Sequence, residues 1–349
     1  MQNSTELHLI VPGICGPLAD THSLGSSPPV NRWVKTLSQS RCQSSAENEN
    51  DVITEILNLK IEGDFPSAAL TLLANDLYDS EMFYMHADPV HLRADMDHAV
   101  LTSSVDLDMK QHESSALCDA LNRHFHQDGL TFFALNKDQW FVSSKHKINM
   151  KTTPLVEATG RNVNFILPAG EDSTRWNQLL TEVQMLMHAH ELNVAREDAG
   201  LFNINSLWFH GSGELPGLAG NAVDTICSQN DMLKGLATHI QCKFIDVPDT
   251  VDAYADYLLG CEHGAKSVLE LSQLEHLVNY TDVSLWMAGL DELLEQWVYP
   301  VLKIMNKNNI KVTLYPCNGK KYQFSKYDAL KFWRHSWRSE EIEKYVSSY

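Results

Sequence analysis

The chain has 349 residues, of which 44% are hydrophobic and 21% are charged, and its formal net charge at pH 7 is -18. This is the composition of an ordinary globular protein with a sizeable core, and it excludes an intrinsically disordered chain. The strong acidity argues against nucleic acid or a membrane surface as the main partner, because both are negatively charged.

Three further features predict a soluble cytoplasmic protein. The seven cysteines are scattered and never spaced as C-x-x-C, which is typical of a reducing compartment rather than of a disulfide or zinc framework. The N-terminus carries no early positive charge, and Pro12 and Gly13 interrupt its apolar run, unlike a signal peptide. No uncharged apolar stretch approaches the roughly 18 residues that a membrane-spanning helix needs.

The spacing of apolar residues predicts strands and helices along the whole chain. In the N-terminal half, strands are expected at residues 7–11, 82–86, 100–101, 130–135, 139–143 and 162–167, with helices at 66–78, 111–125 and 173–187. Residues 23–51 are expected to form a loop around a short helix near 33–37. In the C-terminal half, strands are expected at 204–209, 267–271 and 310–315, with helices at 222–240 and 284–306.

This order of elements predicts the fold class. Strands that alternate with helices indicate an α/β protein with a doubly wound, mainly parallel sheet and helices on both faces. Residues 84–190 mix hairpin-like strands with helices, which indicates an inserted α+β lobe. The core domain is therefore expected at residues 1–83 and 191–349, with the strand at 204–209 in its sheet.

The most specific segment is a predicted strand that runs into a glycine turn. It contains Asn205, Trp208, His210, Gly211 and Gly213. Glycine lets a ligand approach the backbone closely because it has no Cβ atom. The segment lacks the third glycine of a dinucleotide fingerprint and the Gly-Lys-Ser/Thr ending of a P-loop. Ligand binding and a purely structural turn both remain open interpretations.

A second segment, residues 86–98, is rich in groups that bind metals or phosphate. Its candidate ligand-binding residues are His86, Asp88, His91, Arg93 and Asp95. Their spacing matches no zinc or calcium motif, and aspartate beside proline also forms turns. Turn formation next to a ligand is therefore favoured over direct metal binding.

A third segment follows the long helix predicted at residues 173–187. Asn193 and Arg196 are expected in the loop that enters the glycine strand, where they could contact an anion. A salt bridge between Arg196 and a nearby acid is an equally strong alternative. The sequence contains no G-x-S-x-G, S-x-x-K or H-E-x-x-H motif.

In this order, the motifs resemble two related families. Residues 190–196, the strand at 205–213 and the helix that carries Asp224 and Lys234 resemble archaeal-type cofactor-independent phosphoglycerate mutases, mainly over residues 150–240. Nearly the whole chain resembles the RpfE-type regulatory protein family. This second resemblance rests on residues 87–93, 121–130, 160–161, 167–176, 184–196 and the strand at 205.

The resemblance implies an alkaline-phosphatase-like fold and, in the mutases, two divalent ions with a serine or threonine nucleophile. Both ions are needed because they stabilise the attacking and leaving oxygens. Here the first strand ends in Val11-Pro12 where the family has Asp-Gly. A late strand ends in Tyr315-Pro316 where the family has Asp-His, and residues 271–282 lack the D-x-x-x-H pair.

These departures predict a non-catalytic, ligand-binding or regulatory protein without a cofactor, rather than an active mutase. Its partner would be a small anionic ligand or another protein, bound where residues 86–95, 193–196 and 208–213 meet. The alternative is a divergent metal-dependent phosphotransferase or phosphohydrolase that acts on a small phosphorylated metabolite. It would hold a divalent metal such as manganese through His86, Asp88, His91 and Asp95.

Overall fold

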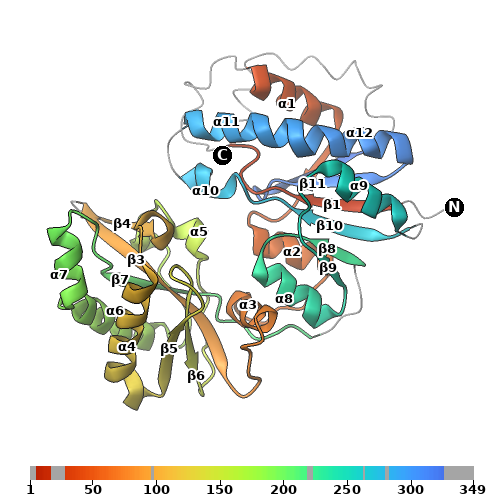
Figure 1. Cartoon of the computed structure of the whole chain (residues 1–349). Coiled ribbons are helices and arrows are strands. Elements are labelled where there is room, and N and C mark those ends of the chain that lie inside the picture. Colours follow the sequence, from red (N-terminus) through yellow and green to blue (C-terminus); the bar gives the residue numbers. More distant parts are fainter. Residues whose placement is uncertain are drawn as a thin grey trace. The chain divides into compact units, whose positions relative to one another are not determined.

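The computed structural model describes residues 5–16, 28–95, 98–217, 223–261, 264–279 and 283–325. The chain forms two compact units (Figure 1): a core unit, Met1–Leu59 with Leu218–Tyr349, and a second unit, Lys60–Gly217. The second unit therefore extends beyond the insert expected at residues 84–190, on both sides.

The core unit contains a seven-stranded, mainly parallel sheet. Its strands are β1 (Glu6–Ile10), β2 (Arg41–Ser44), β8 (Thr225–Cys227), β9 (Lys243–Ile245), β10 (Lys266–Glu270), β11 (Lys311–Tyr315) and β12 (Lys320–Phe324). Their order is β2-β12-β11-β1-β10-β8-β9. Strands β11, β1, β10, β8 and β9 run parallel, whereas β12 is antiparallel to both β11 and β2.

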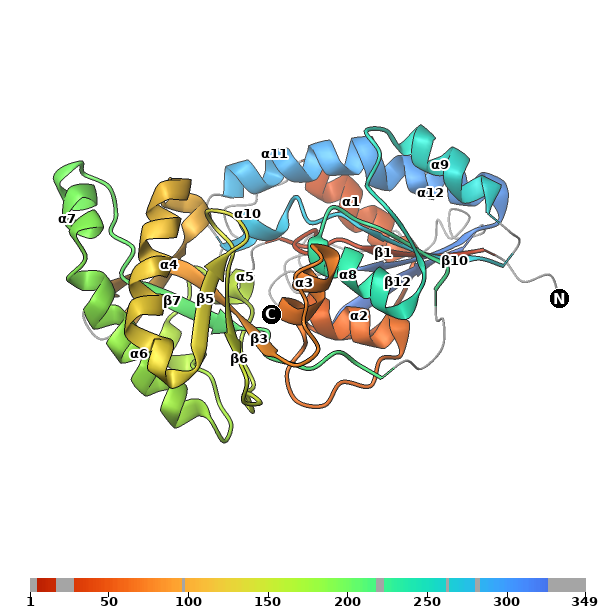
Figure 2. The same ribbon diagram turned by 60° about the horizontal axis from the view of Figure 1, so that its bottom comes forward.

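Helices cover both faces of this sheet (Figures 1 and 2). On one face lie α1 (Pro28–Gln39), α9 (Val251–Gly260), α11 (Val283–Leu293) and α12 (Tyr299–Asn308). Their buried aromatic residues Trp33, Tyr254 and Trp286 share one apolar cluster with Leu7 and Leu9 of β1 and with Trp297, which lies between α11 and α12. On the other face lie α2 (Glu49–Leu57) and α8 (Asp231–Ile240). The short helix α10 (Glu275–Asn279) and a π-helical turn (Leu294–Val298) complete this unit. The doubly wound α/β fold is confirmed.

The second unit is built on an antiparallel sheet. Its strands are β3 (Phe83–Asp95), β4 (His98–Ser103), β5 (Leu130–Ala134), β6 (Trp140–Ser144) and β7 (Ser206–His210). The order is β4-β3-β6-β5, with β7 paired to β3. Its helices are α3 (Ser67–Ala74), α4 (Gln111–Phe125), α5 (Leu155–Ala158), α6 (Ser173–His188) and α7 (Glu191–Asp198), with short 3-10 turns at Ser104–Asp106, His126–Asp128 and Val163–Phe165.

The two faces of this second sheet carry different side chains. Odd-numbered residues such as Met85, Ala87, Leu207 and Phe209 pack with α4 and α6 in one large apolar cluster. Even-numbered residues face the other way, where Tyr84 packs against Ala68 and Leu72 of α3. This period of two is the ordinary alternation of a β-strand, and it decides which polar residues can meet.

Local patterns located most elements, including the β5–β6 hairpin, α4, α6, β10 and β11. Several expectations about local structure were wrong. The strand at 204–209 pairs with β3 instead of joining the core sheet, and residues 162–167 form a 3-10 turn. The helix expected at 222–240 begins only at Asp231, after β8. Of the loop expected at residues 23–51, residues 23–27 lie outside the described residues. The short helix expected near 33–37 lies within the longer α1, and β2 and the start of α2, capped by the Asn48 side chain, replace the rest of the loop.

Proline did not end the strand in the way that the sequence suggested. The turn expected at Ala87-Asp88-Pro89 lies inside the long strand β3. Pro89 has no N–H group to donate, but pairing with β6 ends at His86 and pairing with β4 begins at Val90. On β7, Leu207 lies opposite Pro89, so the strand continues through the proline.

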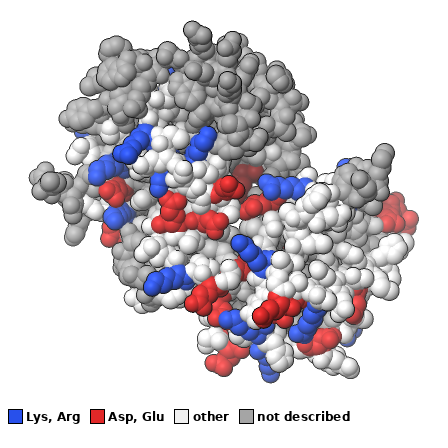
Figure 3. All heavy atoms as spheres, turned by 180° about the vertical axis from the view of Figure 1, so that it is seen from behind, with Lys and Arg blue, Asp and Glu red and all other residues white. Residues whose placement is uncertain are grey.

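The described part of the surface carries charges of both signs. On the face seen in Figure 3, acidic and basic side chains of the described residues are interspersed. None of the helices in the described ranges combines the length and apolar character that a membrane span requires.

Candidate functional site

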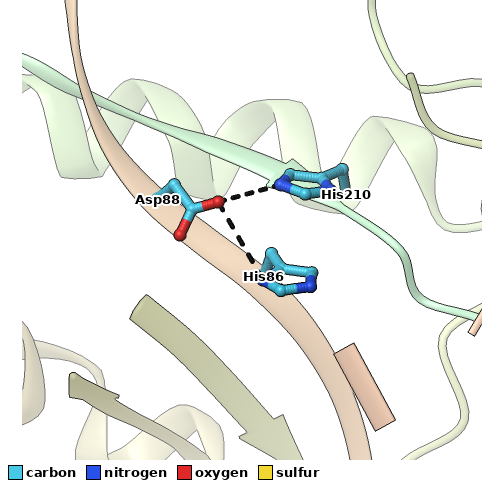
Figure 4. Close-up of side chains that lie close together, drawn as sticks. All are labelled: His86, Asp88 and His210. Carbon is cyan, nitrogen blue, oxygen red and sulfur yellow. Dashed lines mark hydrogen bonds and ion pairs between the residues drawn. The ribbon is translucent and has the colours of Figure 1, made fainter. Parts of the chain in front are cut away.

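Three buried polar side chains meet on one face of the second unit: His86 and Asp88 from β3 and His210 from β7 (Figure 4). His86 lies directly opposite His210 in the antiparallel pairing, so their side chains share a face. The two rings stack with centroids 4.4 Å apart and planes 9° from parallel. Asp88 Oδ2 lies 2.9 Å from His210 Nε2 and 3.9 Å from His86 Nδ1.

The carboxylate of Asp88 is fixed by the end of a neighbouring strand. Pairing between β3 and β6 stops at His86 and Phe141. The preceding residue of β6, Trp140, donates its backbone N–H to Asp88 Oδ1 at 2.9 Å. The side chain of Asp88 thus takes the place of a strand partner, and its second oxygen, Oδ2, is left to face the histidines.

Burial controls the protonation of all three groups. His86, Asp88 and His210 are 4%, 5% and 8% exposed. Burial, reinforced by the neighbouring His210, lowers the pKa of His86 to about 3. Burial lowers the pKa of His210 to about 4 and raises the pKa of Asp88 to about 6. Both imidazoles are therefore neutral at pH 7, and each keeps a nitrogen lone pair that can accept a proton or bind a cation.

Strand alternation separates the other candidates on β3 from this cluster. His91 and Arg93 occupy odd-numbered positions, on the face opposite His86 and Asp88. His91 Nδ1 lies 2.8 Å from the side-chain oxygen of Asn203, and Arg93 is exposed. His91 therefore does not join His86 and Asp88 in the metal set of the alternative hypothesis. The side chain of Asp95 lies outside the described atoms.

Asn193 lies on a helix rather than in the expected loop. His190 caps the new helix α7, with its Nδ1 accepting the Leu192 N–H at 3.2 Å. From α7, Asn193 exchanges hydrogen bonds with the backbone N–H and carbonyl of Ile204, at 2.7 and 2.8 Å. Asn193 thus anchors the chain just before β7, and these contacts are structural.

Arg196 also lies on α7, and protein groups occupy its guanidinium. It donates to both carboxylate oxygens of Glu113, at 2.8 and 3.0 Å. Further donations go to the backbone carbonyls of Leu107 and Phe202. The salt-bridge alternative that the sequence left open therefore describes this residue, and we place no anion contact on it.

Asn205 and Trp208 hold β7 to its neighbours. The Asn205 side chain accepts the backbone N–H of Leu92 at 2.7 Å and donates to the carbonyl of Leu92 at 2.9 Å. Trp208 Nε1 donates to the backbone carbonyl of Thr153 at 2.8 Å. Of the predicted residues, His86, Asp88 and His210 come together, whereas Asn193, Arg196, Asn205 and Trp208 support the sheet around them.

The glycine turn after β7 packs closely against the chain near α3. A Cβ atom on Gly211 would lie 1.9 Å from Ser67 Oγ, and one on Gly213 would lie 1.9 Å from the backbone oxygen of Asp64. The carboxylate of Asp64 accepts the backbone N–H of Ser212 at 3.0 Å and the hydroxyl of Thr152 at 2.5 Å. Backbone packing therefore requires glycine at position 213, while Gly211 combines a close side-chain contact with a φ of +71°. Both observations support the structural interpretation of the turn.

A cavity of about 520 Å³ opens beside this turn within the second unit. Its lining includes the charged residues Asp64, Lys147, Lys151, Glu171 and Glu214, together with Gly213. Lys147 pairs with Glu214 at 2.8 Å. Cavities of this size hold small molecules. It adjoins the predicted glycine segment, but the predicted segments 86–95 and 193–196 do not line it.

Sequence reasoning missed the residues that join the turn to the cavity. Asp64 and Thr152 are 88 residues apart yet share a hydrogen bond. Each lies in a segment without regular periodicity, so no local pattern marked either one. The one available signal was the glycine turn itself, because closely packed glycines imply a neighbouring backbone.

The carboxyl ends of the core strands form a different environment. There β1 is followed by Val11-Pro12 and β11 by Pro316, while β10 ends at Glu270. Glu270 is buried, and its Oε2 accepts the hydroxyl of Ser228 at 2.6 Å. Burial raises the pKa of Glu270. Burial, with the nearby charges of Glu275 and Glu270, also raises the pKa of Glu49, so several carboxyl groups gather at this edge.

Glu270→Gln is expected to make the stability of the protein less dependent on pH. Because the folded state raises the pKa of Glu270, it binds a proton more tightly than the unfolded chain. The free energy of unfolding should therefore fall as pH rises above the ordinary carboxyl value near about 4.3. Between pH 4 and pH 8, the melting temperature of the variant should fall less steeply with rising pH than that of the wild type. The same dependence of melting temperature on pH in both proteins would contradict this. Glu292→Gln, at an exposed site on α11, is the control.

The comparisons with known proteins first concern the fold. No family model matches the chain. The PH0037 protein from Pyrococcus horikoshii has a similar structure, with a TM-score of 0.53, 12% sequence identity, and coverage of 93% of this chain and 88% of that one. At this identity the likeness concerns the fold alone, which is of the α/β, alkaline-phosphatase-like class.

The curated relatives are archaeal enzymes. The chain is 21% identical over 204 residues to the 2,3-bisphosphoglycerate-independent phosphoglycerate mutase of Methanosarcina mazei, over 56% of this chain and 51% of the enzyme. It is 26% identical over 147 residues to mutase 2 of Methanothermobacter thermautotrophicus, over 39% and 36%. The chain thus spans about half the length of the curated relatives or less. Its relationship to archaeal-type cofactor-independent phosphoglycerate mutases is confirmed.

Proposed function

We propose that this chain is a non-catalytic, ligand-binding or regulatory protein on a scaffold related to cofactor-independent phosphoglycerate mutases. The observation that carries the proposal is the set of residues at the carboxyl edge of the core sheet. Val11 and Pro12 follow β1, and Pro316 follows Tyr315, the last residue of β11. This regulatory role agrees with the resemblance to the RpfE-type family.

The donor chemistry of that edge does not fit two divalent ions. Transfer of phosphate with two ions requires several carboxylate and histidine ligands around both metals. The side chains of Val11, Pro12 and Pro316 have no ligand atom. The carboxylates near this edge, Glu49, Glu270 and Glu275, do not converge with a histidine into a metal-binding group within the described residues. We therefore derive no catalytic step through metal ions in the core unit.

The cavity beside Gly213 supports a small ligand as the bound species. Lys151 can attract an anionic group, whereas Lys147 already pairs with Glu214. The other carboxylates of the lining, Glu62, Asp64 and Glu171, would disfavour a ligand of high negative charge. A small molecule with one anionic group and a second group that carries several hydrogen-bond donors fits this lining. Protein partners remain compatible with the same regulatory role.

An activity assay tests the non-catalytic part of the proposal. Purified full-length protein is expected to show no interconversion of 2- and 3-phosphoglycerate, with added Mn²⁺ or Mg²⁺. The reason is that without positioned ions, the transition state loses most of its electrostatic stabilisation. The Methanosarcina mazei mutase serves as the positive control in the same coupled assay. Turnover above about 1 s⁻¹, an ordinary enzymatic rate, would show that the protein is an active mutase.

A further inference from the structure

The polar cluster on the second unit has a binding capacity that its own contacts do not use. His86 Nδ1 is buried and has no hydrogen-bond partner within the described part of the chain. It faces Asp88 Oδ2 at 3.9 Å, which is too far for a hydrogen bond. A buried ring nitrogen that has lost its water without replacement favours a bound group that satisfies it.

We propose that His86, Asp88 and His210 bind one divalent transition-metal ion, with Zn²⁺ as the best fit. One ligand atom of each side chain lies within 4.8 Å of the other two, which is close enough for all three to reach one ion once one ring turns. Two imidazoles and one carboxylate are donors that Zn²⁺ commonly takes. They leave a fourth tetrahedral position for a water molecule.

The surroundings of the cluster favour a defined site over a loose one. The donors stand on two paired strands, where His86 and His210 are direct cross-strand neighbours. Trp140 donates to Asp88 Oδ1, so Oδ2 is the oxygen that faces the two histidines. Outer hydrogen bonds of this kind orient metal ligands and tune their affinity.

Binding requires one imidazole ring to turn. An ion lies close to the plane of each imidazole that ligates it, yet the planes of His86 and His210 are 9° from parallel and stacked. The two lone pairs therefore cannot converge on one ion until one ring rotates about its Cβ–Cγ bond. The metal-bound protein is expected to lose this ring stack.

The site is independent of the proposed function. All three donors belong to the second unit, so the ion needs neither the core strand ends nor the cavity beside Gly213. A zinc-containing protein without mutase activity and an active mutase without zinc are distinguishable results, because metal content and turnover are measured separately.

Metal analysis of the full-length protein tests the proposal. The protein is produced with added Zn²⁺, purified without chelator, and dialysed against graded concentrations of a competing chelator. We expect about one zinc ion per chain. In Asp88→Asn, which keeps an acceptor for the Trp140 N–H, we expect at least about tenfold weaker retention. Cobalt substitution should give visible absorption bands from a low-coordinate site in the wild type only.

A histidine on the same strand provides the matched control. His91 lies on the opposite face of β3 and contacts Asn203, so His91→Gln should retain zinc as the wild type does. If Asp88→Asn fails to fold, His86→Gln takes its place, with circular dichroism as the check of folding. The proposal is overturned if the wild type holds less than about a tenth of an ion per chain. Equal retention by the wild type and a folded ligand variant would overturn it too.

Discussion

Arg196→Ala is expected to lower the free energy of unfolding of the second unit by about 3–5 kcal/mol. The Arg196 side chain is 2% exposed and that of its partner Glu113 is 10% exposed. Removing the guanidinium leaves the carboxylate of Glu113 in a poorly hydrated environment without its positive partner. It also removes a donor to the carbonyls of Leu107 and Phe202, so the segment leading to β7 loses its support.

A thermal melt of the variant measures this loss. For a unit of this size, a loss of 3 kcal/mol or more should lower the melting temperature by about 10 °C. Arg196→Ala combined with Glu113→Gln should recover part of the loss, because the second change removes the stranded charge while keeping an acceptor for the Lys110 N–H. A melting temperature within about 1 °C of the wild type would contradict the structural role of Arg196.

An exposed ion pair between helices of the same unit is the matched control. Glu182 on α6 lies 3.3 Å from His124 on α4, with side chains 57% and 48% exposed. Because water solvates both partners after truncation, Glu182→Ala should change the free energy of unfolding by no more than about 0.5 kcal/mol. The contrast between the two variants isolates the effect of burial.

The fold could be predicted from the sequence wherever the signal was local. Helices α4 and α6 follow from apolar residues at intervals of three and four, and the β5–β6 hairpin follows from two short apolar runs. The membership of β7 could not be predicted in the same way. Its sequence shows a buried strand, but its partner β3 lies more than 100 residues earlier, and no local pattern records that pairing.

The sequence identified the residues of the candidate site but not which of them lie together. His86 and His91 were placed together because they are close in the sequence, yet an odd spacing on one strand sends them to opposite faces. The expected turn at Pro89 hid this relation, because alternation applies only to a continuous strand. His210 joined the cluster through the register of β7, which only the tertiary structure reveals.

Gly213→Ala is expected to destabilise the second unit by up to about 3 kcal/mol, the upper end of ordinary overpacking effects. The added Cβ atom would lie 1.9 Å from the backbone oxygen of Asp64, and a backbone atom cannot rotate away as a side chain can. Asp64 would have to shift, although its carboxylate accepts hydrogen bonds from Ser212 and Thr152. The strain should therefore spread to the wall of the cavity.

Two other glycines make the test specific. Gly211→Ala also brings a Cβ within 1.9 Å of an atom, but that atom is the side-chain oxygen of Ser67, which can turn; the remaining strain comes from its φ of +71°. Gly217→Ala meets nothing within 4 Å and should be neutral or stabilising by up to about 1 kcal/mol. Thermal melts should therefore rank the variants with Gly213→Ala lowest, then Gly211→Ala, and Gly217→Ala at or above the wild type. If Gly213→Ala melts with the wild type, the close packing between the glycine turn and Asp64 is wrong, and with it the wall of the cavity on which the ligand proposal depends.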